Sequence, residues 1–135
     1  MKYMLDTNMC IYLIKKQPQH VFSKFRTLDI GDVCISSITL SELMYGVRKS
    51  QYQQKNKAAL EEFLSPIEVL PFDEDAAVSY GEIRASLEEK GLVIGPLDML
   101  IAAHAKALNA IVVTNNTKEF SRVAHLRIEN WILSA

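Results

Sequence analysis

The sequence contains only two cysteines, and neither stands in a motif with an obvious chemical role. Cys10 and Cys34 lie in apolar stretches, far apart in the chain. Two such cysteines cannot build the disulfide framework of a small secreted domain, and they lack the paired spacing of zinc ligands. We therefore expect both thiols to be reduced and the protein to be cytoplasmic.

Long apolar runs are also missing. No stretch approaches the roughly 20 apolar residues that a membrane-spanning helix needs. Asp6 interrupts the apolar start of the chain too early for the core of a signal peptide. We expect neither a signal peptide nor a membrane partner.

Several catalytic and cofactor motifs are absent as well. The sequence has no GxGxxG motif, no phosphate-binding loop with its lysine, and no serine or cysteine in a nucleophile elbow. The histidines offer no rival chemistry, because His20 and His125 lie in polar surroundings and no pair has zinc-ligand spacing. His104 lies on an apolar helix face, which predicts a core histidine with one hydrogen bond.

What the sequence does contain is an alternation of strand-like and helix-like segments, with no internal repeat, linker or low-complexity tract. This pattern predicts a single α/β domain over residues 1–135, with a central parallel sheet flanked by helices. The predicted strands are residues 2–5, 33–36, 67–71, 111–114 and 126–129. The predicted helices are residues 9–15, 39–47, 51–64, 73–90 and 117–120, with two more beginning at residues 18 and 96.

Four carboxylates stand where such a fold places its functional site. Asp6, Glu42, Asp98 and Glu119 each follow a short apolar or β-rich run, although the run at 92–94 is better interpreted as a loop or a short extended piece. Parallel strands bring their carboxyl ends to one edge of a sheet, so we expect these acids to meet in space. Clustered carboxylates repel unless a cation lies among them, and hard divalent cations prefer oxygen ligands. The sequence therefore favours metal-assisted hydrolysis of a phosphodiester.

Each acid also has a purely structural explanation. Glu42, three residues after Thr39, fits a capping box, and Glu119 permits the same interpretation. Asp6 and Asp98 would complement the starts of helices. The structural and functional explanations are compatible, however, because an α/β site forms where a helix starts beside a strand end. A residue that caps the helix there can also bind a ligand. Polar neighbours would hold ligands in place or position a water molecule: Thr7, Asn8, Ser37, Thr114 and Asn116.

The net charge of −1 does not point to nucleic acid, but its distribution is uneven. Residues 1–57 carry nine lysines and arginines against four acids, and residues 58–98 carry two against ten. Residues 99–135 carry four against two. A nucleic-acid-binding face could thus draw on both ends of the chain. Basic pairs such as residues 15–16 and 48–49 are equally well explained as solvated helix faces.

Four segments carry the acids: residues 4–8 (MLDTN), 38–43 (ITLSEL), 94–98 (IGPLD) and 113–120 (VTNNTKEF). In this order and spacing the chain resembles PIN-domain ribonuclease toxins of the VapC type over nearly its whole length. The resemblance implies about five parallel strands and an endoribonuclease that depends on Mg2+ or Mn2+. It also implies a VapB-like antitoxin, a homodimer and higher assemblies with the antitoxin. The last two segments look most like members that inhibit translation by cutting initiator tRNA in its anticodon loop.

The resemblance also implies roles for the acids. Asp6, Glu42 and Asp98 match three acids of the family directly, and Asp6 and Asp98 would bind the metal. Many members have aspartate where this chain has Glu119, and some have an acid in place of Asn116. Glu42 and Glu119 would bind a second ion or order water molecules. Attack by water would then leave a 3′-hydroxyl and a 5′-phosphate.

Two other classes of protein remain open on the sequence alone. A receiver-like phosphoacceptor domain has a similar size and alternation, but it needs adjacent acids where this chain has Thr7 and Asn8 after Asp6. A non-catalytic binding domain is the other alternative. The presence of all four acids disfavours it.

Overall fold

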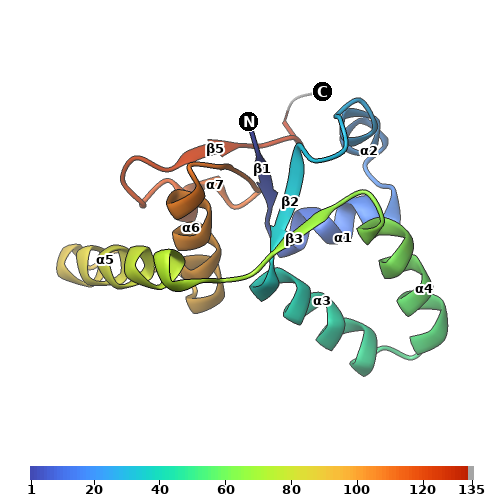
Figure 1. The fold of residues 1–135 in the computed structure, drawn as a ribbon, viewed down its shortest axis with the longest axis horizontal. Coiled ribbons are helices and arrows are strands. Elements are labelled where there is room, and N and C mark those ends of the chain that lie inside the picture. The colour runs from blue at the N-terminus through green and yellow to red at the C-terminus, as the bar shows by residue number, and fades with distance from the viewer. Residues whose placement is uncertain (134–135) are drawn as a thin grey trace.

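Five parallel strands form one sheet at the centre of the molecule (Figure 1). The computed structural model describes residues 1–133. The spatial order of the strands is β3–β2–β1–β4–β5, so the first strand of the chain lies in the middle. The strands are β1 Tyr3–Leu5, β2 Val33–Ser36, β3 Glu68–Leu70, β4 Ile111–Val113 and β5 Arg127–Glu129. The predicted parallel sheet of about five strands is confirmed.

Helices cover both faces of this sheet. In the described residues they are α1 Thr7–Lys15, α2 Gln19–Arg26, α3 Ser37–Lys49, α4 Gln53–Leu64, α5 Glu74–Lys90, α6 Pro96–Leu108 and α7 Thr117–Phe120. Met4 and Val112 pack with α5 and α6 on one face, whereas Leu5 and Val113 pack with α1, α2 and α4 on the other. Successive residues of a strand point to opposite faces, and both faces are covered here. This explains why the central strands are continuous apolar runs.

The predicted elements are close to the observed ones. Residues 33–36 and 117–120 have the predicted bounds, and the bounds given for the other elements differ by at most two residues. Residues 92–94 have no regular structure, as expected. Gly91 ends α5 in the left-handed conformation, with φ of 67°. Glycine adopts this conformation at little cost, which is why it stops the helix where predicted.

Helix α3 begins two residues earlier than predicted, at Ser37. Ser36 is its N-cap, and the Ser36 hydroxyl accepts a hydrogen bond from the N–H of Ile38 at 3.1 Å. Thr39 therefore lies inside the helix, and Glu42 stands in the second turn. The capping-box interpretation of Glu42 is wrong, and a different reason is needed for the acid at this position.

A buried histidine joins the start of α3 to the middle of α6. His104 is 1% exposed, and its Nδ1 lies 2.8 Å from the Ser36 hydroxyl. Its ring packs edge-on against Phe72, with ring centroids 5.5 Å apart. Burial lowers the pKa of His104 below its ordinary value, which keeps the imidazole neutral at pH 7. The expected core histidine is confirmed, and it links the helices that carry Glu42 and Asp98.

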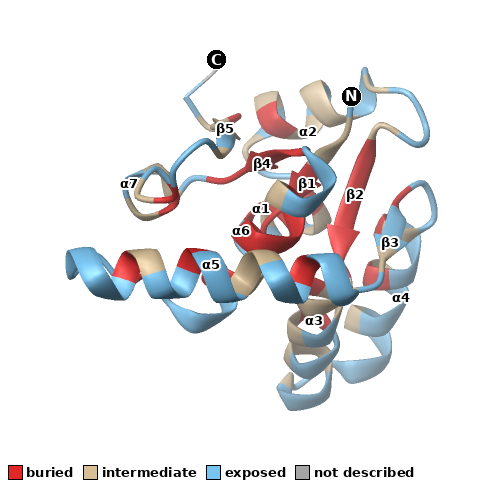
Figure 2. Ribbon diagram, turned by 60° about the vertical axis from the view of Figure 1, so that its left-hand side comes forward, coloured by how far each residue is buried: buried red, intermediate tan, exposed pale blue. Residues whose placement is uncertain are grey.

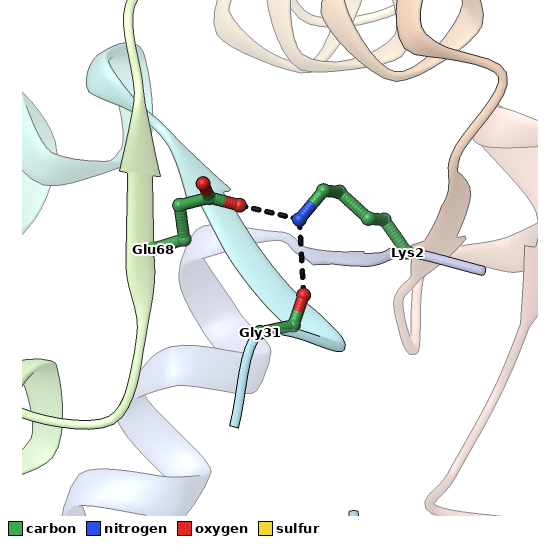
Figure 3. A network of polar contacts seen from close by, with 3 residues as sticks. All are labelled: Lys2, Gly31 and Glu68. Carbon is green, nitrogen blue, oxygen red and sulfur yellow. Dashed lines mark hydrogen bonds and ion pairs between the residues drawn. The ribbon is translucent and has the colours of Figure 1, made fainter. Parts of the chain in front are cut away.

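The amino edge of the sheet has its own polar contact (Figure 3). The Lys2 ammonium donates a hydrogen bond to the carbonyl of Gly31 at 3.0 Å and pairs with the Glu68 carboxylate on β3. This contact ties the beginnings of three neighbouring strands together. Both charged side chains are about two-fifths exposed. We expect the pair to contribute no more than about 1 kcal/mol to stability.

The two cysteines are free and buried, as expected. Burial raises the pKa of the Cys34 thiol to about 11, so the thiol stays protonated at neutral pH. Within residues 1–133, no helix combines the length and the apolar character needed to cross a membrane.

We predict that Ser36→Ala lowers the free energy of unfolding by about 1–3 kcal/mol. The substitution removes the N-cap of α3 and leaves a buried nitrogen of His104 without its partner. Urea unfolding at pH 7 measures the difference. Ser41→Ala is the matched control, because Ser41 is exposed on the same helix, and it should change stability by less than about 0.5 kcal/mol. Equal stability of Ser36→Ala and the parent would contradict the structural role of this contact.

Candidate active site

The carboxyl edge of the sheet holds the first of the four acids. Asp6 directly follows β1 and is 3% exposed. Its backbone N–H donates to the carbonyl of Val113 on β4 at 3.1 Å. Its carboxylate caps α1 by accepting from the N–H of Met9 at 2.9 Å, and it is also hydrogen-bonded to the Thr114 side chain. Asp6 is thus a buried carboxylate that ends a strand and begins a helix.

Glu42 approaches the same edge from α3. It is half-buried, and its Oε1 accepts a hydrogen bond from the Thr7 hydroxyl at 2.6 Å. Thr7 is the first residue of α1 and follows Asp6 directly. The bond therefore holds the Glu42 side chain beside the start of α1, as the position of Thr7 next to Asp6 had suggested.

Asn116 connects the remaining two acids. Its side-chain amide donates to Asp98 Oδ2 at 3.3 Å and to Glu119 Oε2 at 2.9 Å. Its backbone N–H donates to the hydroxyl of Thr114 at 2.8 Å. Because Thr114 also bonds Asp6, a continuous set of hydrogen bonds runs from Asp6 to Glu119. The Glu119 carboxylate therefore accepts a hydrogen bond from the Asn116 side chain. In a capping box it would instead accept one from the backbone N–H of the cap residue.

Burial and the neighbouring negative charges raise the pKa of the two aspartates, Asp6 and Asp98. Burial, with smaller contributions from the charges of Asp98 and Glu42, raises the pKa of Asp6 to about 6, against hydrogen bonds that lower it. Burial likewise raises the pKa of Asp98, opposed by the bond from Asn116 and assisted by the charges of Glu119 and Glu42. Carboxylates from the cap of α1 and from α3, α6 and α7 therefore act on one another at this edge.

The donor set fits a hard divalent cation. It consists of carboxylate oxygens, and within residues 1–133 none of the four acids forms an ion pair with a basic side chain. Within the described residues, no group of three or more acid, histidine or cysteine side chains is placed so that it could hold a metal ion. Mg2+ does not require such a group, since it usually keeps several water molecules and is held by one or two carboxylates. Asp6 and Asp98 can supply such a pair.

Other polar residues near the acids differ in their contacts. Asn8 is exposed in the first turn of α1 and makes none of the hydrogen bonds described for the acids, so its predicted supporting role gains no support. The Ser37 hydroxyl instead accepts from the N–H of Phe72 at 3.0 Å. The Thr39 hydroxyl is fully buried without a hydrogen-bond partner, one turn before Glu42. In the sequence, only the spacing of three residues between Thr39 and Glu42 indicates that the two side chains lie on the same side of the helix.

The chain matches the family model described as "PIN domain" over residues 3–126. This match covers every strand except the last, and it includes all four acids. The chain is therefore a PIN-domain protein, and its parallel sheet is that of this family.

Comparison with individual proteins shows to which branch of the PIN-domain family the chain belongs. The chain is 50% identical to the tRNA(fMet)-specific endonuclease VapC of Shigella flexneri, covering 97% of this chain and 98% of that protein. It is 46% identical to ribonuclease VapC2 of Haemophilus influenzae strain Rd, covering 98% and 99%. The crystal structure of Rickettsia felis VapBC2 bound to a promoter DNA fragment contains a chain with a TM-score of 0.92 and 47% identity, covering 97% and 99%. The chain belongs to the VapC family of PIN-domain ribonucleases.

We predict that Asp6→Asn stabilises the metal-free protein in a pH-dependent way. The raised pKa means that folded Asp6 binds its proton more tightly than the unfolded chain does. The cost of burying the charge is therefore absent below pH ~3.8, grows up to pH ~6 and is constant above it. Asparagine retains an oxygen to accept from Met9 and removes the charge. The gain in unfolding free energy should be about 1–3 kcal/mol at pH 7.5, and smaller by about 1–2 kcal/mol at pH 4.5.

Urea unfolding in EDTA at the two pH values measures this gain. Glu82→Gln is the control, since Glu82 is exposed in the middle of α5, and it should change stability by less than about 0.5 kcal/mol. A gain for Asp6→Asn that is the same at both pH values would show that burial of the charge is not its cause.

Proposed function

We propose that this chain is the endoribonuclease toxin of a toxin–antitoxin module and hydrolyses RNA phosphodiesters with a divalent cation. The observation that supports this most directly is the convergence of Asp6, Glu42, Asp98 and Glu119 on one edge of the sheet without an ion-paired base among the described residues. The names of the relatives, which specify ribonuclease activity, agree with this chemistry.

Asp6 and Asp98 would hold Mg2+, or Mn2+ in its place, and Glu42 and Glu119 would contribute through water molecules or a second ion. A cation bound there lowers the pKa of a coordinated water molecule and stabilises negative charge on the attacked phosphate. Such all-oxygen ligands suit hard cations, which is the reason for preferring these two metals.

The surrounding residues orient the acids for this reaction. Thr7 holds Glu42, Thr114 and the N–H of Met9 hold Asp6, and Asn116 holds both Asp98 and Glu119. One of the four carboxylates would accept a proton from the attacking water. The water oxygen would bond to phosphorus as the bond to the 3′ oxygen breaks, and the departing 3′ oxygen would take up a proton from solvent, which leaves a 3′-hydroxyl and a 5′-phosphate.

The proposed substrate is initiator tRNA, cut in its anticodon loop, with inhibition of translation as the result. The Shigella flexneri relative is named as specific for this tRNA, and the chain matches it over nearly its full length. A single-stranded loop is also the part of a tRNA whose unstacked bases and backbone can approach an open acidic edge.

An antitoxin resembling VapB is the proposed partner. A groove of about 300 Å³ lies between α1, α3 and α4 and contains Thr7 and Glu42 of the acid edge. Its walls are mainly apolar: Ile11, Ile14, Leu43, Val47, Ala59 and Leu60. An apolar antitoxin helix would fit there, with a basic side chain facing the acids. Ile11 and Ile14 of α1 line the groove, whereas Tyr12 packs against the core and does not.

The remaining features of the proposal rest on the family resemblance. A cytoplasmic homodimer that forms higher assemblies with the antitoxin would be consistent with the VapBC complexes of Rickettsia felis and Salmonella typhimurium, both described as bound to DNA. The single nuclease domain would span residues 1–135.

We predict that Asp98→Asn abolishes RNA cleavage while the protein remains folded, because the change removes a metal-binding charge and no core volume. Antitoxin-free parent and variant are incubated with total tRNA and Mn2+, and products are resolved on denaturing gels. Excess EDTA should stop the parent to the same extent. Glu82→Gln, the exposed control on α5, should cleave at the parent rate. A folded Asp98→Asn protein with parent activity, or full parent activity in EDTA, would refute the assigned site.

We also predict a specific position for the cut. Mapping of the new RNA ends should place them in the anticodon loop of initiator tRNA and show 5′-phosphates, which ligation to an adaptor detects directly. Cleavage scattered through mRNA with intact tRNA would refute the proposed substrate but not the metal-dependent chemistry.

A further inference from the structure

A stripe of side chains runs along α3 from the half-buried Glu42 to the exposed Tyr45 and Lys49. Glu42, Tyr45 and Lys49 are spaced three and four residues apart, so they share one face of the helix. At a rise of 1.5 Å per residue, Tyr45 lies about 4.5 Å and Lys49 about 10 Å beyond Glu42 along the axis. Figures 1 and 2 show α3 extending away from the sheet from its start at the end of β2. The stripe therefore leads outward from the acid edge.

Tyr45 and Lys49 contact each other in an arrangement suited to a nucleic acid. The Lys49 ammonium lies 5.1 Å from the centroid of the Tyr45 ring, and the tyrosine is 65% exposed. The lysine orients the ring and covers one part of it, while most of the side chain stays open to solvent. An aromatic ring beside a fixed cation can stack on a base and bind the adjacent phosphate.

The helix surface at Gly46, beside Glu42 and Tyr45, is open. Gly46 follows Tyr45 and stands one turn beyond Glu42, and a Cβ added there would meet no atom within 4 Å. A flexible strand can therefore come close to the helix backbone at this point. The path from Tyr45 to the acids is not closed by a side chain at position 46.

Charge and continuity identify the occupant of this stripe. The four acids repel a phosphate backbone, so the substrate needs positive charge next to the site, and Lys49 with its exposed neighbour Arg48 supplies it. The groove proposed for the antitoxin also contains Glu42 and Gly46, but its apolar residues on α3 are Leu43 and Val47, and neither Tyr45 nor Lys49 lines it. We propose that Tyr45 and Lys49 bind the single-stranded RNA segment next to the scissile phosphate. This inference rests on the proposed function of the acid site.

The test uses binding without cleavage. Variants are made in the Asp98→Asn background, and a short, unstructured, fluorescein-labelled RNA is titrated in EDTA and followed by fluorescence anisotropy. Tyr45→Ala should weaken binding about 10- to 100-fold, whereas Tyr45→Phe should stay within about twofold, because the phenylalanine ring still stacks. Lys49→Ala should lower the slope of log affinity against log salt by about 0.7, as expected for one lost phosphate contact.

Two matched controls separate this stripe from general surface effects. Tyr52 is also 65% exposed but lies in the connection between α3 and α4, and Tyr52→Ala should bind within about twofold of the background. Lys90 is the last residue of α5, as Lys49 is of α3, and Lys90→Ala should leave the salt slope unchanged. In the cleavage-competent protein, Tyr45→Ala should raise KM while kcat changes less than threefold.

The outcomes distinguish this inference from the proposed function. Unchanged RNA affinity of Tyr45→Ala overturns the inference, whether or not the parent cleaves RNA. Binding that depends on Tyr45 in a protein without Mn2+-dependent cleavage supports the inference and refutes the proposed function. Light scattering is run on the same samples. A Tyr45→Ala protein that loses RNA binding only because its dimer falls apart overturns the inference and assigns the ring to an interface between copies.

Discussion

The structure is organised around one buried carboxylate, that of Asp6. Asp6 ends the central strand, begins α1 and pairs through its backbone with β4, so it cannot move to solvent without disturbing three elements. A carboxylate in this position is costly, and hydrogen bonds from Met9 and Thr114 offset only part of the cost. The fold thus keeps a charge where stability alone would disfavour one, as is common at functional sites.

The neighbouring elements are arranged around that charge. Thr7 and Asn116 are neutral donors, and each holds an acid at the same edge without neutralising it. A lysine or arginine in their place would lower the repulsion, but it would also occupy the position of a cation. The contact between Ser36 and His104 fixes the two helices that carry Glu42 and Asp98, using groups that are themselves uncharged at pH 7. Rigidity and net negative charge are therefore supplied by different residues.

The sequence was sufficient for the architecture and for the convergence of the four acids, because both follow from local patterns. Apolar runs predicted the strands, and the position of each acid after such a run predicted their convergence. The starts of α1 and α3 were placed two residues late because Asp6 and Ser36, which end their strands, also act as the caps. The bridging role of Asn116 could not be predicted, because it depends on distances between α6 and α7 that no local pattern encodes. The same holds for the unpaired hydroxyl of Thr39.

The central place of the first strand has a consequence for synthesis on the ribosome. β1 emerges first, yet one of its two neighbours is β4, more than 100 residues later, so this pairing is strongly non-local and forms late. The carboxylates at residues 6 and 119 belong to opposite ends of the chain and meet only when almost all of it is available. A nascent chain thus carries an incomplete set of acids until the segment that contains Glu119 has left the ribosome. Under the proposed function, shorter nascent chains would therefore lack a complete catalytic site.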